Sequence, residues 1–195
     1  MAIISLIKKC ARGFAGGRPD DVRSRRVVAL IECVLNQNAR DCGAACSPAI
    51  NAKVLEVCLR HSIGIIQIPC PEQAVLGLGR VRPDGVSLRD AMSTPAARAC
   101  CNAIAESIVS RLKQYEQAGQ TVVAILGGNP LSPGCATQSA SCVVDAEGLL
   151  IVALRASLAS YGLEIPILAI RDSDWRLHAQ DINSFDRLCA GPPHP

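Results

Sequence analysis

Cysteines are the residues of this chain with the clearest capacity for chemistry. The 195 residues include 11 cysteines, and Cys33, Cys70 and Cys135 each come after a short aliphatic segment. Cys70 lies between two prolines, and Cys135 ends the turn Ser132-Pro133-Gly134-Cys135. Stiff turns of this kind hold a thiolate in one direction at small entropic cost. Three such thiolates could bind a metal or an iron-sulfur cluster, whereas a single strand-end cysteine is about as often a small buried hydrophobic residue.

The high cysteine content fits two classes of protein, a secreted disulfide framework or an intracellular chain that uses thiolates as ligands or nucleophiles. The odd number of cysteines, the long aliphatic segments and the lack of a convincing secretory signal favour the second class. We therefore expect reduced thiols and a cytoplasmic location.

Four aliphatic segments predict the strands that must position these cysteines. They are short and apolar at both alternating positions, which is typical of strands buried on both faces of a sheet. The predicted strands are 27–31, 63–68, 121–126 and 165–170.

Predicted helices alternate with the predicted strands. One opens at Pro48 with Ser47 as its cap, a second is capped by Thr94 and ends at Gly119, and a third covers about 147–161. The Gly-rich and Pro-rich stretch between Glu72 and Met92 is predicted as a long irregular loop, suited to a lid or a substrate-binding segment.

The alternation of strands and helices predicts an α/β fold with a doubly wound, mostly parallel, Rossmann-like sheet in a single domain. The domain is expected at 26–190, after an N-terminal extension at 1–25 and before a disordered tail at 191–195. The extension is predicted to be a frayed leader, with a transit-like segment as the alternative. Ligands of such sheets bind outside the carboxyl ends of the strands, so the three strand-end cysteines should converge there.

Composition excludes some partners. Aromatic residues make up 3% of the chain, the net charge is +3, and basic residues are scattered, which argues against nucleic-acid binding. No apolar run reaches the ~18 residues of a membrane span. We expect no membrane partner, and a monomer or homodimer.

Three blocks of sequence together resemble the thiouracil desulfidase family and its uncharacterised relatives. They are Glu32-Cys33-Val34-Leu35-Asn36-Gln37-Asn38-Ala39, Ile68-Pro69-Cys70-Pro71-Glu72 and Ser132-Pro133-Gly134-Cys135. The resemblance spans roughly 27–136. The third block has Gly134 and Ala136 beside the cysteine where the family usually has Ser and Gly, which indicates a related branch.

The resemblance implies a 4Fe-4S cluster held by Cys33, Cys70 and Cys135, with one iron open to the sulfur of a small thiolated substrate. It further implies non-redox desulfidation, with no electron-transfer partner. Glu72 is then the candidate general acid and base, and Ser132 could orient the substrate or a cluster sulfur. Asn36 could contact the cluster. Each has a structural alternative: an ion pair of Glu72 with an arginine such as Arg80 or Arg82, a turn at Ser132, and a plain loop at Asn36.

Other interpretations remain open. Cys42 and Cys46 form a C-x3-C pair that, with Cys33, could instead hold zinc or a cluster within one loop. A non-enzymatic iron-sulfur or thiol redox sensor and a persulfide sulfurtransferase are the alternative functions.

Overall fold

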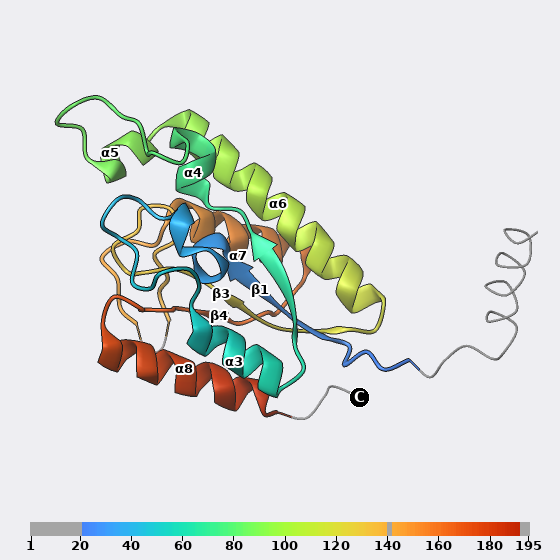
Figure 1. The fold of residues 1–195 in the computed structure, drawn as a ribbon. Coiled ribbons are helices and arrows are strands. Elements are labelled where there is room, and N and C mark those ends of the chain that lie inside the picture. Colours follow the sequence, from blue (N-terminus) through green and yellow to red (C-terminus); the bar gives the residue numbers. More distant parts are fainter. Residues whose placement is uncertain (1–20, 140–141, 192–195) are drawn as a thin grey trace, which may run out of the picture.

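The computed structural model describes residues 21–139 and 142–191. Most of the predicted N-terminal extension and nearly all of the predicted tail lie outside these described residues. The described part forms one α/β unit in which helices cover both faces of a sheet (Figure 1).

The sheet has four parallel strands in the order β2-β1-β3-β4. The strands are β1 (Arg26–Ile31), β2 (Gly64–Ile68), β3 (Thr121–Leu126) and β4 (Ile167–Leu168). Val27 of β1 pairs with Gly64 on one side and with Val122 on the other. The chain therefore moves outward from β1 to β2 and returns across β1 to β3. This reversal places a topological switch point between β1 and β3, where sheets of this kind bind ligands.

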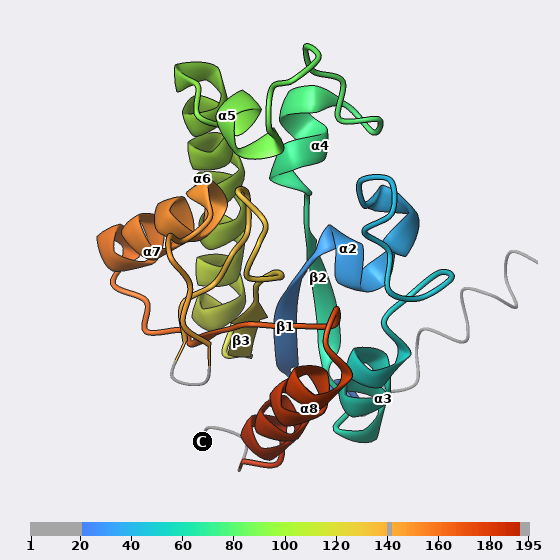
Figure 2. The same cartoon turned by 90° about the vertical axis from the view of Figure 1, so that its left-hand side faces the viewer.

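The helices lie in two layers. Their bounds are α2 (Glu32–Leu35), α3 (Ala52–Arg60), α4 (Pro71–Leu76), α5 (Leu88–Met92), α6 (Pro95–Gln117), α7 (Leu149–Tyr161) and α8 (Trp175–Cys189), with a 3-10 turn η1 (Gln37–Ala39). Figures 1 and 2 show α6 and α7 on one face of the sheet, and α3 and α8 on the other. The predicted α/β fold with a parallel sheet is confirmed.

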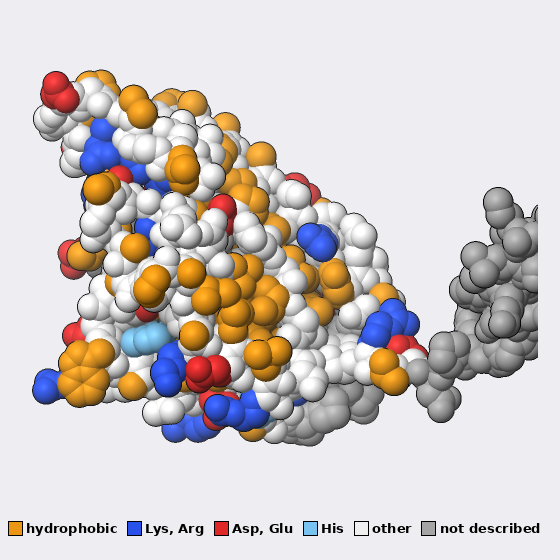
Figure 3. All heavy atoms as spheres, viewed as in Figure 1, with side chains coloured by type: hydrophobic (Ala, Val, Ile, Leu, Met, Phe, Trp, Pro, Cys, Tyr) orange, Lys and Arg blue, Asp and Glu red, His pale blue; other side chains and the backbone are white. Residues whose placement is uncertain are grey.

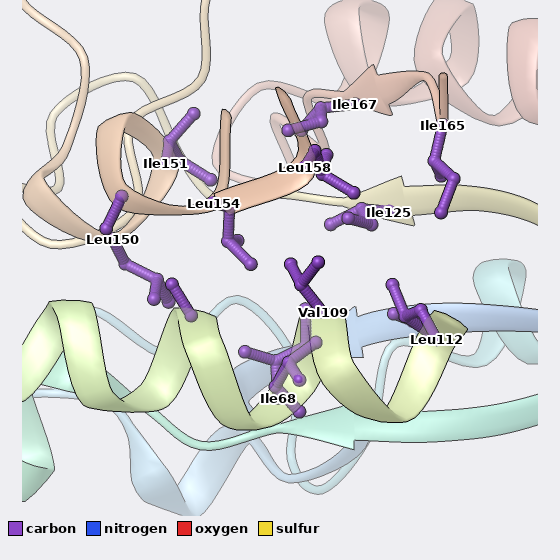
Figure 4. Close-up of a cluster of buried hydrophobic side chains, with 14 of the residues drawn as sticks. Ile68, Val109, Leu112, Ile125, Leu150, Ile151, Leu154, Leu158, Ile165 and Ile167 are labelled. Carbon is purple, nitrogen blue, oxygen red and sulfur yellow. The ribbon is translucent and has the colours of Figure 1, made fainter. Parts of the chain in front are cut away.

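Each face of the sheet has its own hydrophobic core. On one side Ile68 and Ile125 of the sheet pack with Val109 of α6 and with Leu150 and other residues of α7 (Figure 4). On the other side the opposite faces of β1 and β3 pack against α2, α3 and α8. These two cores fix the strand ends, and with them the loops that leave the sheet.

The long helix α6 matches its prediction. Thr94 caps it by accepting a hydrogen bond from the backbone N–H of Ala97, and Pro95 occupies its first turn. The helix ends at Gln117, two residues before Gly119, whose φ of 72° belongs to the left-handed region.

The predicted start of the helix at Pro48 is wrong, because α3 begins at Ala52. Asn51 is the cap, and its side chain accepts a hydrogen bond from the backbone N–H of Val54. The hydroxyl of Ser47 instead donates to the carbonyl of Ile50 at 2.9 Å, which closes a turn before the helix. The same residue type can cap a helix or close a turn, and here the second role prevails.

The stretch predicted as an irregular loop contains two short helices, α4 and α5. Cys70 is the N-cap of α4 with Pro71 at its first position, and Ser87 caps α5 by accepting from the backbone N–H of Asp90 at 3.1 Å. Only the segment between Gly77 and Ser87 is irregular. The numerous Gly and Pro residues obscured these local helix signals.

The last strand and the last helix also differ from expectation. The predicted strand 165–170 is paired only at Ile167 and Leu168, although Ile165 and Ile170 are buried. Its apolarity therefore reflects burial more than pairing. Helix α8 was not predicted; Asp174 caps it, and Phe185 buries its side chain against the sheet.

Strand β2 is one edge of the sheet, and Ile65 on it is 38% exposed. Figure 3, in the view of Figure 1, shows hydrophobic side chains gathered over the middle of the side of the molecule that faces the viewer.

None of the helices in the described ranges has both the length and the hydropathy needed to cross a bilayer.

Candidate functional site

A cavity of about 460 Å³ lies at the carboxyl end of the sheet, where the loops that leave the strands meet. All four strands contribute to its lining through Cys33 after β1, Cys70 after β2, Cys135 after β3 and Ser173 after β4. The cavity occupies the position that a ligand site takes in open parallel sheets.

The structure brings together the three predicted cysteines in this cavity. Cys33 lies in the first turn of α2, Cys70 caps α4, and Cys135 follows the Ser132-Pro133-Gly134 turn. The thiols are close enough to influence one another's ionisation, because Cys33 and Cys70 both act on the pKa of Cys135. Residues from three distant parts of the sequence thus share one small volume.

Each of these thiols has its own hydrogen-bond partner. Arg40 Nη2 lies 3.7 Å from Cys33 Sγ, and Arg80 Nη2 donates to Cys70 Sγ at 3.3 Å. Cys135 Sγ donates to Ser132 Oγ at 3.1 Å. The two guanidinium donors would stabilise Cys33 and Cys70 as thiolates and help to offset the charge of a bound cluster.

Carboxylates hold these partners in place. Asp172 accepts hydrogen bonds from Arg40 Nη2 at 2.7 and 2.9 Å. Glu72 Oε1 accepts a hydrogen bond from Ser132 Oγ at 2.6 Å, while Glu72 Oε2 lies 3.7 Å from Arg80 Nε. Glu72 therefore contacts both the predicted serine and one of the two arginines named as its structural alternative, and the two interactions coexist.

Burial dominates the ionisation of the three thiols. It raises the pKa of Cys33 to about 11, and the Arg40 guanidinium partly opposes the rise. Burial also raises the pKa of Cys70, and it raises that of Cys135 well above the ordinary range of a thiol. The thiols hold their protons near neutral pH in the metal-free protein, so metal binding would have to release them.

Glycines allow the chain to pack tightly around Cys135. A methyl group added at Gly128 would collide with the sulfur of Cys135, and one at Gly148 would collide with its backbone N. At Gly134 a methyl group would come within 2.7 Å of Pro71, on the neighbouring loop. The contacts at Gly128 and Gly134 explain why the turn after β3 has glycine at these two positions.

The three thiols that line the cavity are of the ligand type that holds an iron-sulfur cluster. Among the described residues, no three His, Cys, Asp or Glu side chains are placed to bind one ion. Cluster thiolates bind separate irons and need not meet at one point. In addition, the buried side chain of Arg80 lines the cavity and donates from Nη2 to Cys70 Sγ at 3.3 Å, while its Nε lies 3.7 Å from Glu72 Oε2. A positive charge beside a ligand sulfur suits an anionic, sulfur-rich group.

Asn36 is placed differently from the other predicted site residues. Its side chain is exposed, and its amide oxygen accepts hydrogen bonds from the backbone N–H and the side-chain amide of Asn38 at 3.1 Å each. This geometry favours the plain loop role, and its predicted contact with a cluster stays a prediction.

Sequence reasoning missed Arg40 and Asp172, which line or support the cavity. Asp172 lies two residues after the predicted fourth strand, so its position at a strand end was an available signal. Arg40 lies in a polar loop without periodicity, and nothing around it in the sequence indicated the site.

Comparisons with known proteins give little further information. The chain is 29% identical over 96 residues to the uncharacterised protein MJ0003 of Methanocaldococcus jannaschii, a match that covers 49% of this chain and 59% of that protein. The chain thus spans less than two thirds of that relative. No family model matches the chain, and no solved structure matches it.

Proposed function

We propose that Cys33, Cys70 and Cys135 hold a 4Fe-4S cluster and that the protein removes sulfur, as sulfide, from a small thiolated compound. One observation carries the proposal: three thiols, each with its own hydrogen-bond partner, line one cavity whose wall also includes the buried guanidinium of Arg80. When bound, the cluster would supply an open iron that acts as a Lewis acid toward the substrate sulfur.

The two arginines would balance charge. Three thiolates and a cluster bring negative charge into a buried cavity, and isolated buried charges are costly. Arg40 and Arg80 each place a guanidinium nitrogen within 3.7 Å or less of a ligand sulfur. Their own carboxylate partners fix their direction, which is the usual arrangement around metal ligands.

Glu72 and Ser132 would handle the protons of the reaction. In the net reaction a thiocarbonyl compound and one water give the corresponding carbonyl compound and one hydrogen sulfide, without oxidation or reduction. The carboxylate of Glu72 would take a proton from the attacking water and return it to the departing sulfur. The Ser132 hydroxyl, which donates to Glu72 Oε1 at 2.6 Å, orients that carboxylate toward the cavity.

The first experiment tests the ligand set. The purified protein is reconstituted with iron and sulfide without oxygen, and iron content and absorbance near ~400 nm are measured for the wild type and for single Cys→Ser variants. We expect about four irons per chain, lost in Cys33→Ser, Cys70→Ser and Cys135→Ser. Cys42→Ser is the matched control, because Cys42 lines the same cavity. If Cys42→Ser loses the cluster while Cys135→Ser keeps it, the ligand set is wrong.

The second experiment tests the chemistry. Sulfide release is measured from a panel of thioamides and thiol acids with the reconstituted protein. Glu72→Gln should keep its iron and lose activity by about 10²–10⁴-fold, the usual contribution of a general acid or base. An intact cluster with no sulfide release from any compound would favour a redox sensor. Sulfur transfer that persists without iron would favour a persulfide sulfurtransferase.

The same proposal places the protein in a reducing compartment such as the cytoplasm, because ten described cysteines are free thiols. No electron-transfer partner is required, since the net reaction is not a redox reaction.

A further inference from the structure

A further thiol lies in the cavity next to the proposed ligand Cys33. The loop between η1 and α3 contributes Cys42 and Cys46 to the cavity wall, and both residues are exposed. The proposed function has no role for either of them.

Two side chains place Cys46 beside Cys33. Gln37, which is 1% exposed, accepts a hydrogen bond from the backbone N–H of Cys46 at 2.8 Å and donates to the carbonyl of Cys33 at 2.7 Å. Arg40 donates from Nη1 to Cys46 Sγ at 3.2 Å, while its Nη2 lies 3.7 Å from Cys33 Sγ. One amide therefore links the two backbones, and one guanidinium links the two sulfurs.

Cys42 lacks these links although it lies in the same loop. Its backbone N–H donates to the side chain of the adjacent Asp41 at 2.9 Å. Within the described ranges, no hydrogen bond reaches the sulfur of Cys42. Proximity in the loop is thus not enough to place a thiol beside Cys33, and the Gln37 and Arg40 contacts single out Cys46.

We propose, on the basis of the function proposed above, that Cys46 is a displaceable fourth ligand: its sulfur occupies the remaining iron until a substrate sulfur replaces it. Arg40, fixed by Asp172, would steady the Cys46 sulfur during the exchange. A substrate thiol that binds as a thiolate gives up one proton, and the released Cys46 thiolate can accept it. A thiocarbonyl substrate binds without losing a proton, and the released Cys46 thiolate then takes its proton from solvent. The exchange is therefore balanced in charge and protons, and it needs no oxidant or reductant.

Exposure of Cys46 suits a ligand that leaves. Cys33 and Cys70 are half-buried and Cys135 is buried, so those thiols have little freedom to move away from a cluster. The Cys46 side chain is exposed on a loop that contains Gly43 at a φ of 76°. When its sulfur leaves the iron, it can turn to solvent while Gln37 keeps its backbone in place.

Mössbauer spectroscopy of protein reconstituted with ⁵⁷Fe can test this assignment without any substrate. With Cys46 bound, the wild-type cluster should show four similarly ligated irons, and Cys46→Ala should convert one iron in four into a distinct site. Cys46→Ala should also lose that iron more readily on mild oxidation with ferricyanide. Cys42→Ala, the matched control from the same loop, should behave as the wild type in both measurements.

The outcomes separate the two proposals. A wild-type cluster that already has one distinct iron, unchanged in Cys46→Ala, overturns the Cys46 assignment and leaves the desulfidase proposal standing. A change in Cys42→Ala in place of Cys46→Ala also overturns it. Failure of the wild-type protein to assemble any cluster overturns both proposals.

Discussion

The buried ion pair between Arg40 and Asp172 gives the sharpest prediction for stability. The two side chains are 10% and 4% exposed, and Arg40 Nη2 lies 2.7 Å from Asp172 Oδ2. The Asp172 carboxylate also accepts from the amide of Gln37 at 3.3 Å. Substitution Asp172→Ala leaves the guanidinium buried without its counter-charge. Loss of one partner of a buried pair costs about 3–5 kcal/mol, which is a large share of the ~5–15 kcal/mol that stabilises a typical domain.

Urea unfolding of the metal-free protein, followed by circular dichroism, measures this loss. Asp186→Ala is the control, because Asp186 pairs with Arg60 on the surface with side chains 35% and 58% exposed; its effect should be far smaller. If Asp172→Ala does not fold, Asp172→Asn keeps one carbonyl acceptor and should show a smaller loss of the same sign. If Asp172→Ala lowers the free energy of unfolding by less than about 1 kcal/mol, water or another group compensates the charge of Arg40, and the stabilising role assigned to this ion pair is refuted.

Two further predictions concern packing and pH. Gly128→Ala should destabilise the protein by about 1–3 kcal/mol in urea unfolding and lower its iron uptake, because the new methyl group collides with the Cys135 sulfur. Gly79→Ala is the control, because its methyl group would meet only Val81 at 3.8 Å, and it should change iron uptake little. Burial raises the pKa of Cys58 to about 11 and that of Cys189 to about 12. Above about pH 9 the unfolded chain therefore loses these protons first, and stability should fall by up to about 1.4 kcal/mol per pH unit for each thiol. Urea unfolding at a series of pH values from about pH 8 to about pH 11 measures this fall in stability. An unfolding free energy that stays constant with pH in the wild type, or that falls equally steeply in Cys58→Ala, would contradict the raised pKa values of these buried thiols.

The parts of the fold that local pattern controls were predictable. The three longer strands and the helix α6 follow from aliphatic runs, a Thr94 cap and a helix-ending Gly119, all of which act within a few residues. The meeting of Cys33, Cys70 and Cys135 in one cavity follows from topology, because parallel strands deliver their carboxyl ends to the same edge.

The missing parts depend on contacts between distant segments. Arg40 has no local signal, and the carboxylate that fixes its guanidinium, Asp172, lies 132 positions later in the chain. Such a pairing requires three-dimensional information that a single sequence read locally does not contain. Helix α8 is different, because Ile182, Phe185 and Cys189 lie at helical spacing and pack in the core beside the sheet, so a local signal for this helix was available.

The long separation between Arg40 and Asp172 also bears on when the cavity can be completed during synthesis. Cys33, Cys70 and Cys135 emerge from the ribosome before Asp172, so the Arg40 contact with Cys33 lacks its anchor while the chain is being made. Contacts of such high sequence separation form late, since a long loop must close first. Under the proposed function, delivery of a cluster would then follow folding of the complete sheet. A chain that ends before Asp172 would present the three cysteines without the fixed guanidinium beside Cys33.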